Sequence, residues 1–208
     1  SKAFEIIDIL EKSYDSNPEV PQINVDDLMY DYEHRTPLSV AIETGNTKLV
    51  QALLKYGADC NKVRSCVGYD TDGNPMDLHW VPLTGALELK ESGFEMMELL
   101  LRFGANPNVI LPNGTTLLHT LSRTVFVPDT VKRLHLLLAH IAPSKLSHLM
   151  NLHEETDTTI VLINAIQSLI SRDKSFLPIV HILLKTASIE LEAQSKYGLT
   201  PMAYCITH

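Results

Sequence analysis

The sequence predicts an all-α fold in which short helix pairs stack one after another along the chain. Two observations lead to this prediction. Apolar residues recur at helical spacing in short segments that Gly, Asn and Pro interrupt. The segment that follows one of these helix pairs, Gly57-Ala-Asp-Cys-Asn61, returns as Gly104-Ala-Asn-Pro-Asn108. A segment that returns in this way indicates an internal repeat, and repeated helix pairs form a stacked array.

The clearest unit covers residues 31–63 and contains two expected helices. Thr36 is a suitable cap for the first helix, and Pro37 fits its first turn because the amide hydrogen that proline lacks is not needed there. Gly45 ends the first helix and Gly57 the second, since glycine adopts left-handed backbone angles without strain. Between these signals both helices carry one apolar face. Its residues are Leu38, Ala41, Ile42, Leu49, Val50, Leu53 and Leu54.

With a helix, a tight turn, a second helix and a Gly-Ala-Asp-x-Asn exit, residues 31–63 resemble the ankyrin repeat and match its length without a gap. The resemblance implies an ankyrin-repeat solenoid of stacked helix-turn-helix units with projecting β-turn or hairpin loops, about four units plus a partial fifth. We expect a capping helix and linker at residues 1–30 and the array at residues 31–208. The expected units cover residues 31–63, 64–110, 111–143, 155–191 and 195–208.

Three of these units depart from the family pattern. The second carries a polar, glycine-containing insertion within residues 64–76. Loops longer than a fold needs are often recruited for recognition, so we weigh a binding loop against an idle one. The third unit has a longer linker between its helices, which contains Val127-Pro128-Asp129. It keeps His119 where the resemblance implies a histidine that joins adjacent turns by hydrogen bonds. The fourth keeps only the apolar spacing, and the pattern lapses between Pro143 and Asp157.

Composition narrows the class of protein. Of the 208 residues, 45% are hydrophobic and 20% charged, which is enough apolar material for a core and excludes disorder over most of the chain. Asp and Glu outnumber Lys and Arg by 25 to 17, and the net charge of −8 argues against nucleic acid as a partner. The longest apolar stretches are far shorter than the roughly 20 residues of a membrane span. Three cysteines, an odd number, indicate reduced thiols and a cytoplasmic location.

No motif in the sequence meets the requirements of a catalytic or metal-binding site. Residues 70–74 imitate the start of a calcium loop, but Pro75 replaces the glycine that the turn needs. Cys60, Cys66 and His79 match neither the spacing of a zinc site nor that of a thiol nucleophile, and Cys60 is expected to be a core thiol. No phosphate loop, nucleophile elbow or zinc-protease helix occurs. The sequence therefore predicts no enzyme, no metal and no cofactor.

The resemblance implies a protein-binding function. In ankyrin repeats the turn tips and the exposed side of each first helix are free of stacking duties and typically contact the partner. Trp80, the single tryptophan, suits an anchor at such a position, or else it packs against the neighbouring insertion. The expected partner-binding positions are Tyr32, Glu33, Arg35, Glu43, Thr44, Tyr69, Asp77, Trp80, Glu88, Leu89, Asn113, Thr115, Arg123, Thr124, Lys196 and Tyr197.

We expect a monomer that captures one partner protein, and the acidic balance favours a partner with a basic patch. The degenerate units and the insertion favour an effector that acts in the cytosol of a host cell over a scaffold protein. An alternative is the substrate-docking or autoinhibitory arm of a larger enzyme whose catalytic domain lies outside residues 1–208. A small-molecule pocket ranks last, because no convergent set of polar residues is visible in the sequence.

Overall fold

A computed structural model of the chain describes residues 26, 35–69, 75–124, 129–153, 160–171, 177–186, 190–195 and 197–207. The expected capping helix at residues 1–30 therefore lies, apart from Asp26, outside the described residues. The chain divides into two compact units, Ser1–Ala105 and Asn106–His208. Each is considered by itself.

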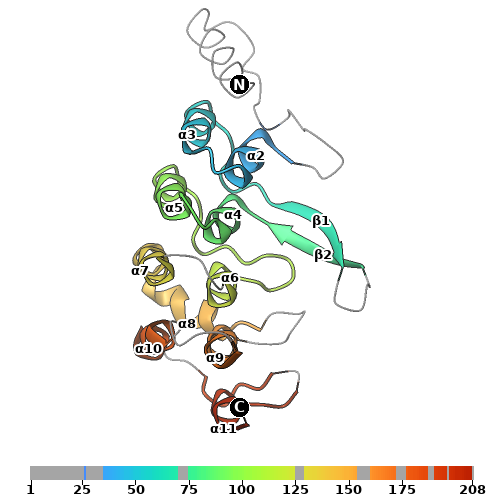
Figure 1. The fold of residues 1–208 in the computed structure, drawn as a ribbon, viewed down its shortest axis with the longest axis vertical. Helices are drawn as coiled ribbons and strands as arrows, with labels where there is room; N and C mark the ends of the chain where they lie inside the picture. Colours follow the sequence, from blue (N-terminus) through green and yellow to red (C-terminus); the bar gives the residue numbers. More distant parts are fainter. Residues whose placement is uncertain are drawn as a thin grey trace, which may run out of the picture. The chain divides into compact units, whose positions relative to one another are not determined.

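The first unit contains two helix pairs (Figure 1). The first helices of the two pairs pack against each other, and so do the second helices, so that like helices form two layers around a shared core. The core consists of the apolar faces that the sequence predicts, with Leu38, Ile42, Val50 and Leu53 fully buried. The helices are α2 (Pro37–Glu43), α3 (Thr47–Lys55), α4 (Pro82–Glu88) and α5 (Gly93–Arg102).

The two exit segments have equivalent conformations, as the repeat predicts. Gly57 ends α3 with a φ of 88°, and Gly104 ends α5 with a φ of 91°, values that glycine adopts without strain. The exits also contact each other. Asn61 Nδ2 donates to the carbonyl oxygen of Gly104 at 3.1 Å, and Cys60 Sγ to that of Phe103 at 3.5 Å. These bonds tie the two turns together within the first unit.

The insertion in the second pair forms an antiparallel β-hairpin of β1 (Arg64–Tyr69) and β2 (Pro75–Trp80). Its first strand begins where the first repeat ends, and its second runs up to the residue before α4. The register pairs Arg64 with Trp80 at the end of the ribbon nearest the helices, which we call the hairpin root. Strand pairing therefore extends beyond the insertion expected within residues 64–76, as far as Trp80.

The second unit is built around α9, which packs against α6, α10 and α11 (Figure 1). The helix α8 occupies the stretch after Pro143 where the sequence pattern lapses, so the lapse does not mean an absence of structure. Its buried residues, Leu146, Leu149 and Met150, face α9 over little more than two turns. The helices are α6 (Leu117–Arg123), α7 (Thr130–His140), α8 (Pro143–Asn151), α9 (Val161–Ser171), α10 (Leu177–Thr186) and α11 (Pro201–Thr207).

His119 is a buried residue that forms a reciprocal pair of hydrogen bonds with Thr116. It is fully buried in the first turn of α6. Its Nδ1 accepts a hydrogen bond from the backbone N–H of Thr116 at 3.3 Å, while the Thr116 hydroxyl accepts from the backbone N–H of His119 at 3.4 Å. This reciprocal pair is a capping box, which fixes where α6 begins.

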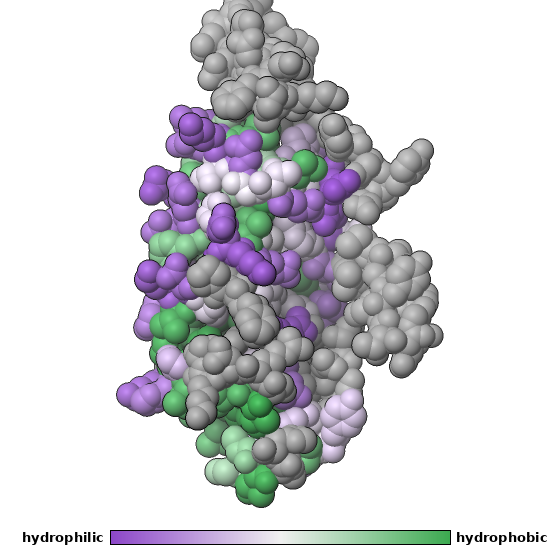
Figure 2. All heavy atoms as spheres, in the orientation of Figure 1, coloured by the Kyte–Doolittle hydropathy of each residue, from purple (hydrophilic) through white to green (hydrophobic). Residues whose placement is uncertain are grey.

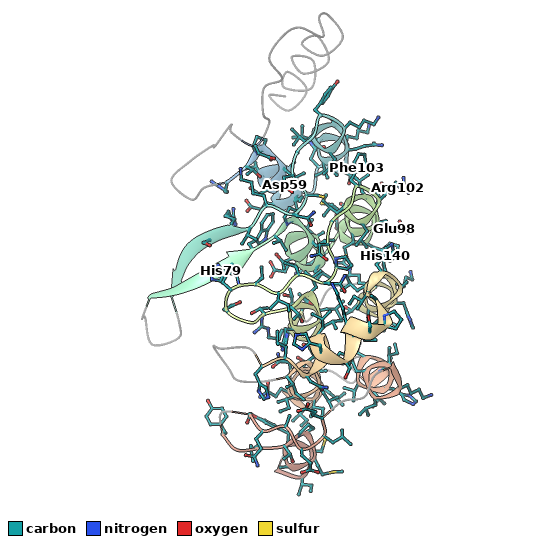
Figure 3. All side chains as sticks on the ribbon, turned by 180° about the vertical axis from the view of Figure 1, so that it is seen from behind. Asp59, His79, Glu98, Arg102, Phe103 and His140 are labelled. Atoms are coloured by element: carbon teal, nitrogen blue, oxygen red, sulfur yellow. The ribbon has the colours of Figure 1, made fainter. Side chains whose placement is uncertain are left out.

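Figure 2 shows hydrophilic residues gathered over α3 and α5, and an apolar surface over α11. The side chains of Glu98 and Arg102 lie on the outer side of α5 (Figure 3), where they keep that helix face solvated. On α11 the exposed apolar residues are Met202 and Ile206. Among the helices of the described residues, none is both long enough and apolar enough to cross a bilayer.

Candidate functional site

The hairpin root is fixed to the first helix of the unit by a shared carboxylate. Glu43, in the last turn of α2, accepts a hydrogen bond from Arg64 Nη1 on Oε1 at 2.9 Å and is 3.4 Å from Arg35 Nη1 through Oε2. Arg64 belongs to the first position of β1, and its side chain is only 14% exposed. An ion pair that is this sheltered is less screened by water than a surface pair. The contact therefore holds the hairpin against α2.

Trp80 completes the root from the opposite strand. The Arg64 guanidinium carbon lies 4.9 Å from the centre of the indole ring, within the range of a cation–π contact. The indole also lies against Gly85 of α4. A Cβ added to Gly85 would lie 2.9 Å from Trp80 Cε2, closer still to Cζ2, and 3.1 Å from Ile42 Cγ2. The half-buried indole is thus packed into the fold through Arg64 and Gly85.

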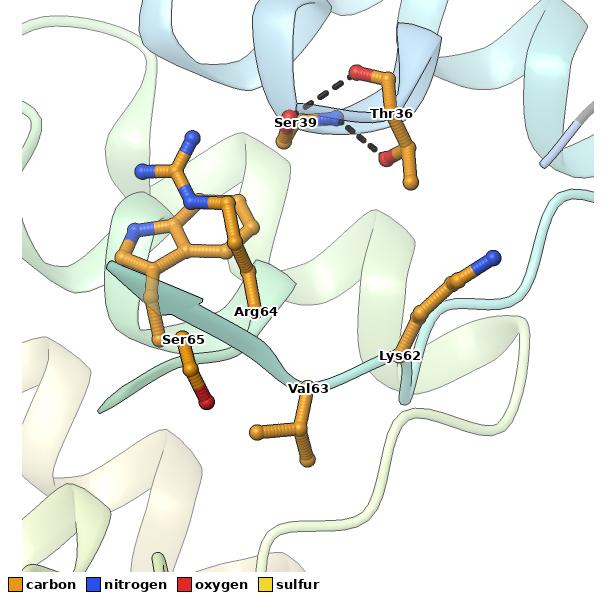
Figure 4. Close-up of a pocket in the computed structure, with 7 residues that line it drawn as sticks. Thr36, Ser39, Lys62, Val63, Arg64 and Ser65 are labelled. Atoms are coloured by element: carbon orange, nitrogen blue, oxygen red, sulfur yellow. Dashed lines mark hydrogen bonds between the residues drawn. The ribbon is translucent and has the colours of Figure 1, made fainter. Parts of the chain in front are cut away.

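A pocket of about 230 Å³ opens beside this root (Figure 4). Two of the lining residues, Thr36 and Ser39, already hydrogen-bond to each other. Ser39 Oγ donates to the Thr36 carbonyl at 2.8 Å, and Thr36 Oγ1 accepts from the Ser39 amide at 3.2 Å. Small-molecule pockets are usually about 300–1,000 Å³, so this one has room for a single side chain. It is lined by Thr36, Ser39, Lys62, Val63, Arg64, Ser65 and Trp80.

The comparisons with known proteins bear on the same segment. Residues 33–65 match the family model of the ankyrin repeat. The chain contains an ankyrin repeat. No curated protein matches the sequence. The matched ankyrin repeat spans α2 and α3 and ends on Arg64 and Ser65, so it supplies six of the seven residues that line the pocket.

Ankyrin repeats are generally protein–protein interaction modules and are typically non-catalytic. The described residues agree with the expectation that Cys60 is a core thiol. Cys60 is buried, and burial, with a smaller contribution from the Asp59 charge, raises the pKa of its thiol. A raised pKa makes a poor nucleophile and a poor metal ligand, because both roles need the thiolate. Within the described part of the chain no three His, Cys, Asp or Glu side chains are grouped closely enough to hold a metal ion.

Other expected contact residues of the first unit are spread around the ankyrin repeat and the hairpin. Thr44 and Glu88 are exposed, and Leu89 is half-buried. The Thr44 hydroxyl donates to the carbonyl oxygen of Val40 at 2.9 Å, so it already has a partner inside α2. The structure places Tyr69 opposite Pro75 and Asp77 opposite Val67 in the hairpin. The expected contacts Tyr32 and Glu33 lie outside the described residues.

In the second unit one expected contact is wrong. Thr115 is only 5% exposed, so its side chain does not project from a turn tip as predicted. Its backbone explains why, because the Thr115 carbonyl accepts from the Leu111 amide and its N–H donates to Asn113 Oδ1 at 3.2 Å, which folds the turn inward. Asn113 and Thr124 are half-buried, Arg123 is exposed and Tyr197 is 69% exposed. The expected contact Lys196 lies outside the described residues.

Of the residues that line the pocket, the sequence singled out only Thr36, as a cap, and Trp80, as a contact. It missed Ser39, Lys62, Val63, Arg64 and Ser65. The repeat pattern ends at residue 63, and the insertion that follows has no counterpart in the pattern, so neither gave a reason to choose them. The sequence did contain one signal that could have pointed to this site. Val63 is an apolar residue directly before the hairpin, and it remains 47% exposed in the structure.

Ser65 Oγ lies 3.0 Å from His79 Nδ1 across the ribbon, and His79 is labelled in Figure 3.

Proposed function

We propose that this chain is a protein-binding module whose contact surface is centred on the hairpin root and the pocket beside it. The observation that carries the proposal is the exposed Val63 at the rim of a pocket in the ankyrin repeat, next to a hairpin that α2 and α4 hold in place. A partner that meets a preformed surface loses less ordering entropy than one that must order a loop. The ion pairs and the packed indole hold the hairpin root in place, and this preformed surface therefore favours binding.

The partner that we propose is one protein, bound by a monomer of this chain. The net charge of −8 attracts basic surfaces over a distance, so a partner with a basic patch is favoured during approach. Contacts would extend from the pocket over the C-terminal end of α2, where Glu43 and Thr44 lie, over Arg35, which precedes α2, and over the hairpin. These positions are a subset of those that the sequence predicts.

A capture experiment with matched variants tests the proposal. The tagged chain is used to isolate proteins from a cell lysate, in parallel with Val63→Arg and Gln51→Arg. Val63→Arg places bulk and charge at the rim of the pocket, whereas Gln51 is exposed on α3, a helix that contributes nothing to the pocket. We expect a specific partner that the Val63 variant loses and the Gln51 variant keeps, with equal helix content by circular dichroism.

Two results would contradict the proposal. One is a partner that withstands Val63→Arg but is lost with Gln51→Arg, which would move the contact surface to the face of α3. The other is the absence of any protein that the intact chain retains above a tag-only control.

A further inference from the structure

Two of the residues that line the pocket are cations, and none of these lining residues is a carboxylate. Lys62 Nζ donates to the backbone carbonyl oxygen of Asp26 at 3.3 Å, and no carboxylate of the described residues comes within ion-pair distance of it. Arg64 shares the single carboxylate of Glu43 with Arg35. The pocket wall therefore carries two cations, of which Arg64 is paired with Glu43.

The two other acidic groups near the pocket are engaged with the backbone. Asp26 Oδ2 accepts the amide of Asp59 at 2.8 Å, and Asp59 Oδ1 accepts the amide of Asn61 at 2.8 Å. Both carboxylates thereby shape the turn after α3 and neither lines the pocket. Arg64 Nε is buried without a hydrogen-bond partner among the described residues, so the guanidinium is not fully satisfied by Glu43. Lys62 and Arg64 are thus the charged residues of the pocket wall, and Lys62 Nζ is paired with no carboxylate of the described residues.

Apolar surface lies beside this charge. Trp80 and the exposed Val63 side chain line the same pocket as the two cations. The volume of about 230 Å³ accommodates one side chain and not a cofactor-sized molecule. An occupant that satisfies both kinds of wall has a negative group to meet Lys62 and an apolar neighbour to cover Val63.

We propose that this pocket receives the carboxylate of an aspartate or glutamate in a partner segment whose adjacent residue is apolar. This inference rests on the proposed protein-binding function and specifies the chemistry of its central contact. The overall charge of −8 does not oppose it, because charges beyond about 8–10 Å are screened at physiological salt and the nearest charges dominate. The partner then approaches through its basic surface and anchors through one acidic side chain.

Trp80 gives the test its readout. It is the single tryptophan of the chain, and it lines the pocket, so its fluorescence reports occupancy. The probe is a short capped Gly/Ser peptide with a Glu-Leu-Glu core, and its matched control has a Gln-Leu-Gln core. We expect a saturable change of Trp80 emission with the glutamate peptide that weakens as salt is added, and at least about tenfold weaker binding by the glutamine peptide, since a charged hydrogen bond contributes roughly that much.

Two variants test whether the peptide binds to the pocket or only to positive charge elsewhere on the surface. Lys62→Gln should weaken the glutamate peptide at least about tenfold, whereas Lys55→Gln should leave it unchanged, because Lys55 is exposed on α3 and does not line the pocket. Equal thermal unfolding of both variants would confirm that folding is not the cause. Equal binding of the two peptides, an equal effect of the two variants, or a short oligonucleotide that binds the pocket as well as the glutamate peptide would overturn the inference.

The two proposals can fail separately. If the captured partner depends on Val63 while the glutamate peptide leaves Trp80 emission unchanged, the pocket chemistry is wrong and the binding function stands. If the peptide binds through Lys62 but no partner depends on Val63, the proposed function is wrong and the pocket recognises acidic groups for another purpose.

Discussion

At the scale of single residues, the hairpin root depends on how closely the Trp80 indole approaches α4. Gly85 lies in the interior of that helix, where alanine would ordinarily be favoured by about 1 kcal/mol. Glycine is required here because the indole occupies the space of a Cβ. The Arg64 guanidinium also lies over the ring, 4.9 Å from its centre. The root therefore combines a cation–π contact with close packing of the indole on a helix backbone.

Gly85→Ala should destabilise the first unit despite the gain in helix propensity. The added methyl would meet Trp80 Cε2 at 2.9 Å and Ile42 Cγ2 at 3.1 Å, and overpacking of this kind costs about 1–3 kcal/mol. Urea unfolding followed by Trp80 fluorescence measures both the stability and the environment of the ring. In a Trp80→Ala background, followed by circular dichroism, the cost should shrink. An equal cost in both backgrounds would show that the indole does not rest on Gly85.

Cys60 should give the protein a pH-dependent stability. Burial raises the pKa of its thiol, so the folded state keeps the proton in a range where the unfolded thiol, with a pKa of about 8.5, loses it. The contribution is fully present below that value and is lost as the pH rises above it. Urea unfolding at about pH 7 and about pH 9.5 should show a smaller decline for Cys60→Ala than for the intact chain. Cys205→Ala is the matched control, because Cys205 is exposed; an equal decline in both variants would refute the assignment.

At the scale of elements, the ends of the helices are set by side chains that the sequence identifies. Thr36 caps α2 with its hydroxyl, and Asn46 caps α3 by accepting from the Leu49 amide at 3.1 Å. The capping box at α6 uses the buried imidazole of His119 in addition to the hydroxyl of Thr116. Local signals of this kind explain why the paired helices agree closely with the prediction.

His119→Ala should destabilise the second unit more than Thr36→Ala destabilises the first. Loss of a cap alone costs about 1 kcal/mol. Removal of a fully buried ring also leaves a cavity, which brings the expected cost for His119 to about 2–4 kcal/mol. Chemical denaturation followed by circular dichroism compares the two variants. A cost for His119→Ala that is no larger than that for Thr36→Ala would mean that the imidazole contributes nothing beyond the cap.

Two elements could not be predicted from the sequence, for different physical reasons. The strands β1 and β2 form by pairing with each other, and the period-2 signal of a strand is weak in a segment with Gly68 and Pro75. The helix α8 is short and buries only a narrow face, so its apolar spacing fell below the pattern of a repeat. The hairpin and α8 both depend on tertiary contacts, which the spacing of residues in the sequence does not reveal.

At the scale of the whole molecule, the same limit applies to the candidate site. Arg35, Glu43 and Trp80 stand out in the sequence as surface positions of a repeat, but nothing there indicates that Arg64 joins them. The burial of Thr115 is another property that only the folded turn reveals. The sequence thus supports the class of fold and of function, and the three-dimensional structure supplies the site.

The net charge of −8 should appear in the kinetics of association. For a partner with a basic patch, the association rate falls as salt is added, because screening removes long-range attraction. The dissociation rate should change much less, since it depends on the packed contact. Surface plasmon resonance at several salt concentrations measures both rates. An association rate that is constant or rises with salt would contradict the proposed basic patch.

The central claim is that a partner protein contacts the hairpin root, and site-specific photocross-linking tests it most directly. A photoreactive amino acid is placed at position 63 in one variant and at position 51 in another, both on the surface of the first unit. We predict a covalent adduct with the captured partner from position 63 and none from position 51. An adduct from position 51 alone would contradict the claim.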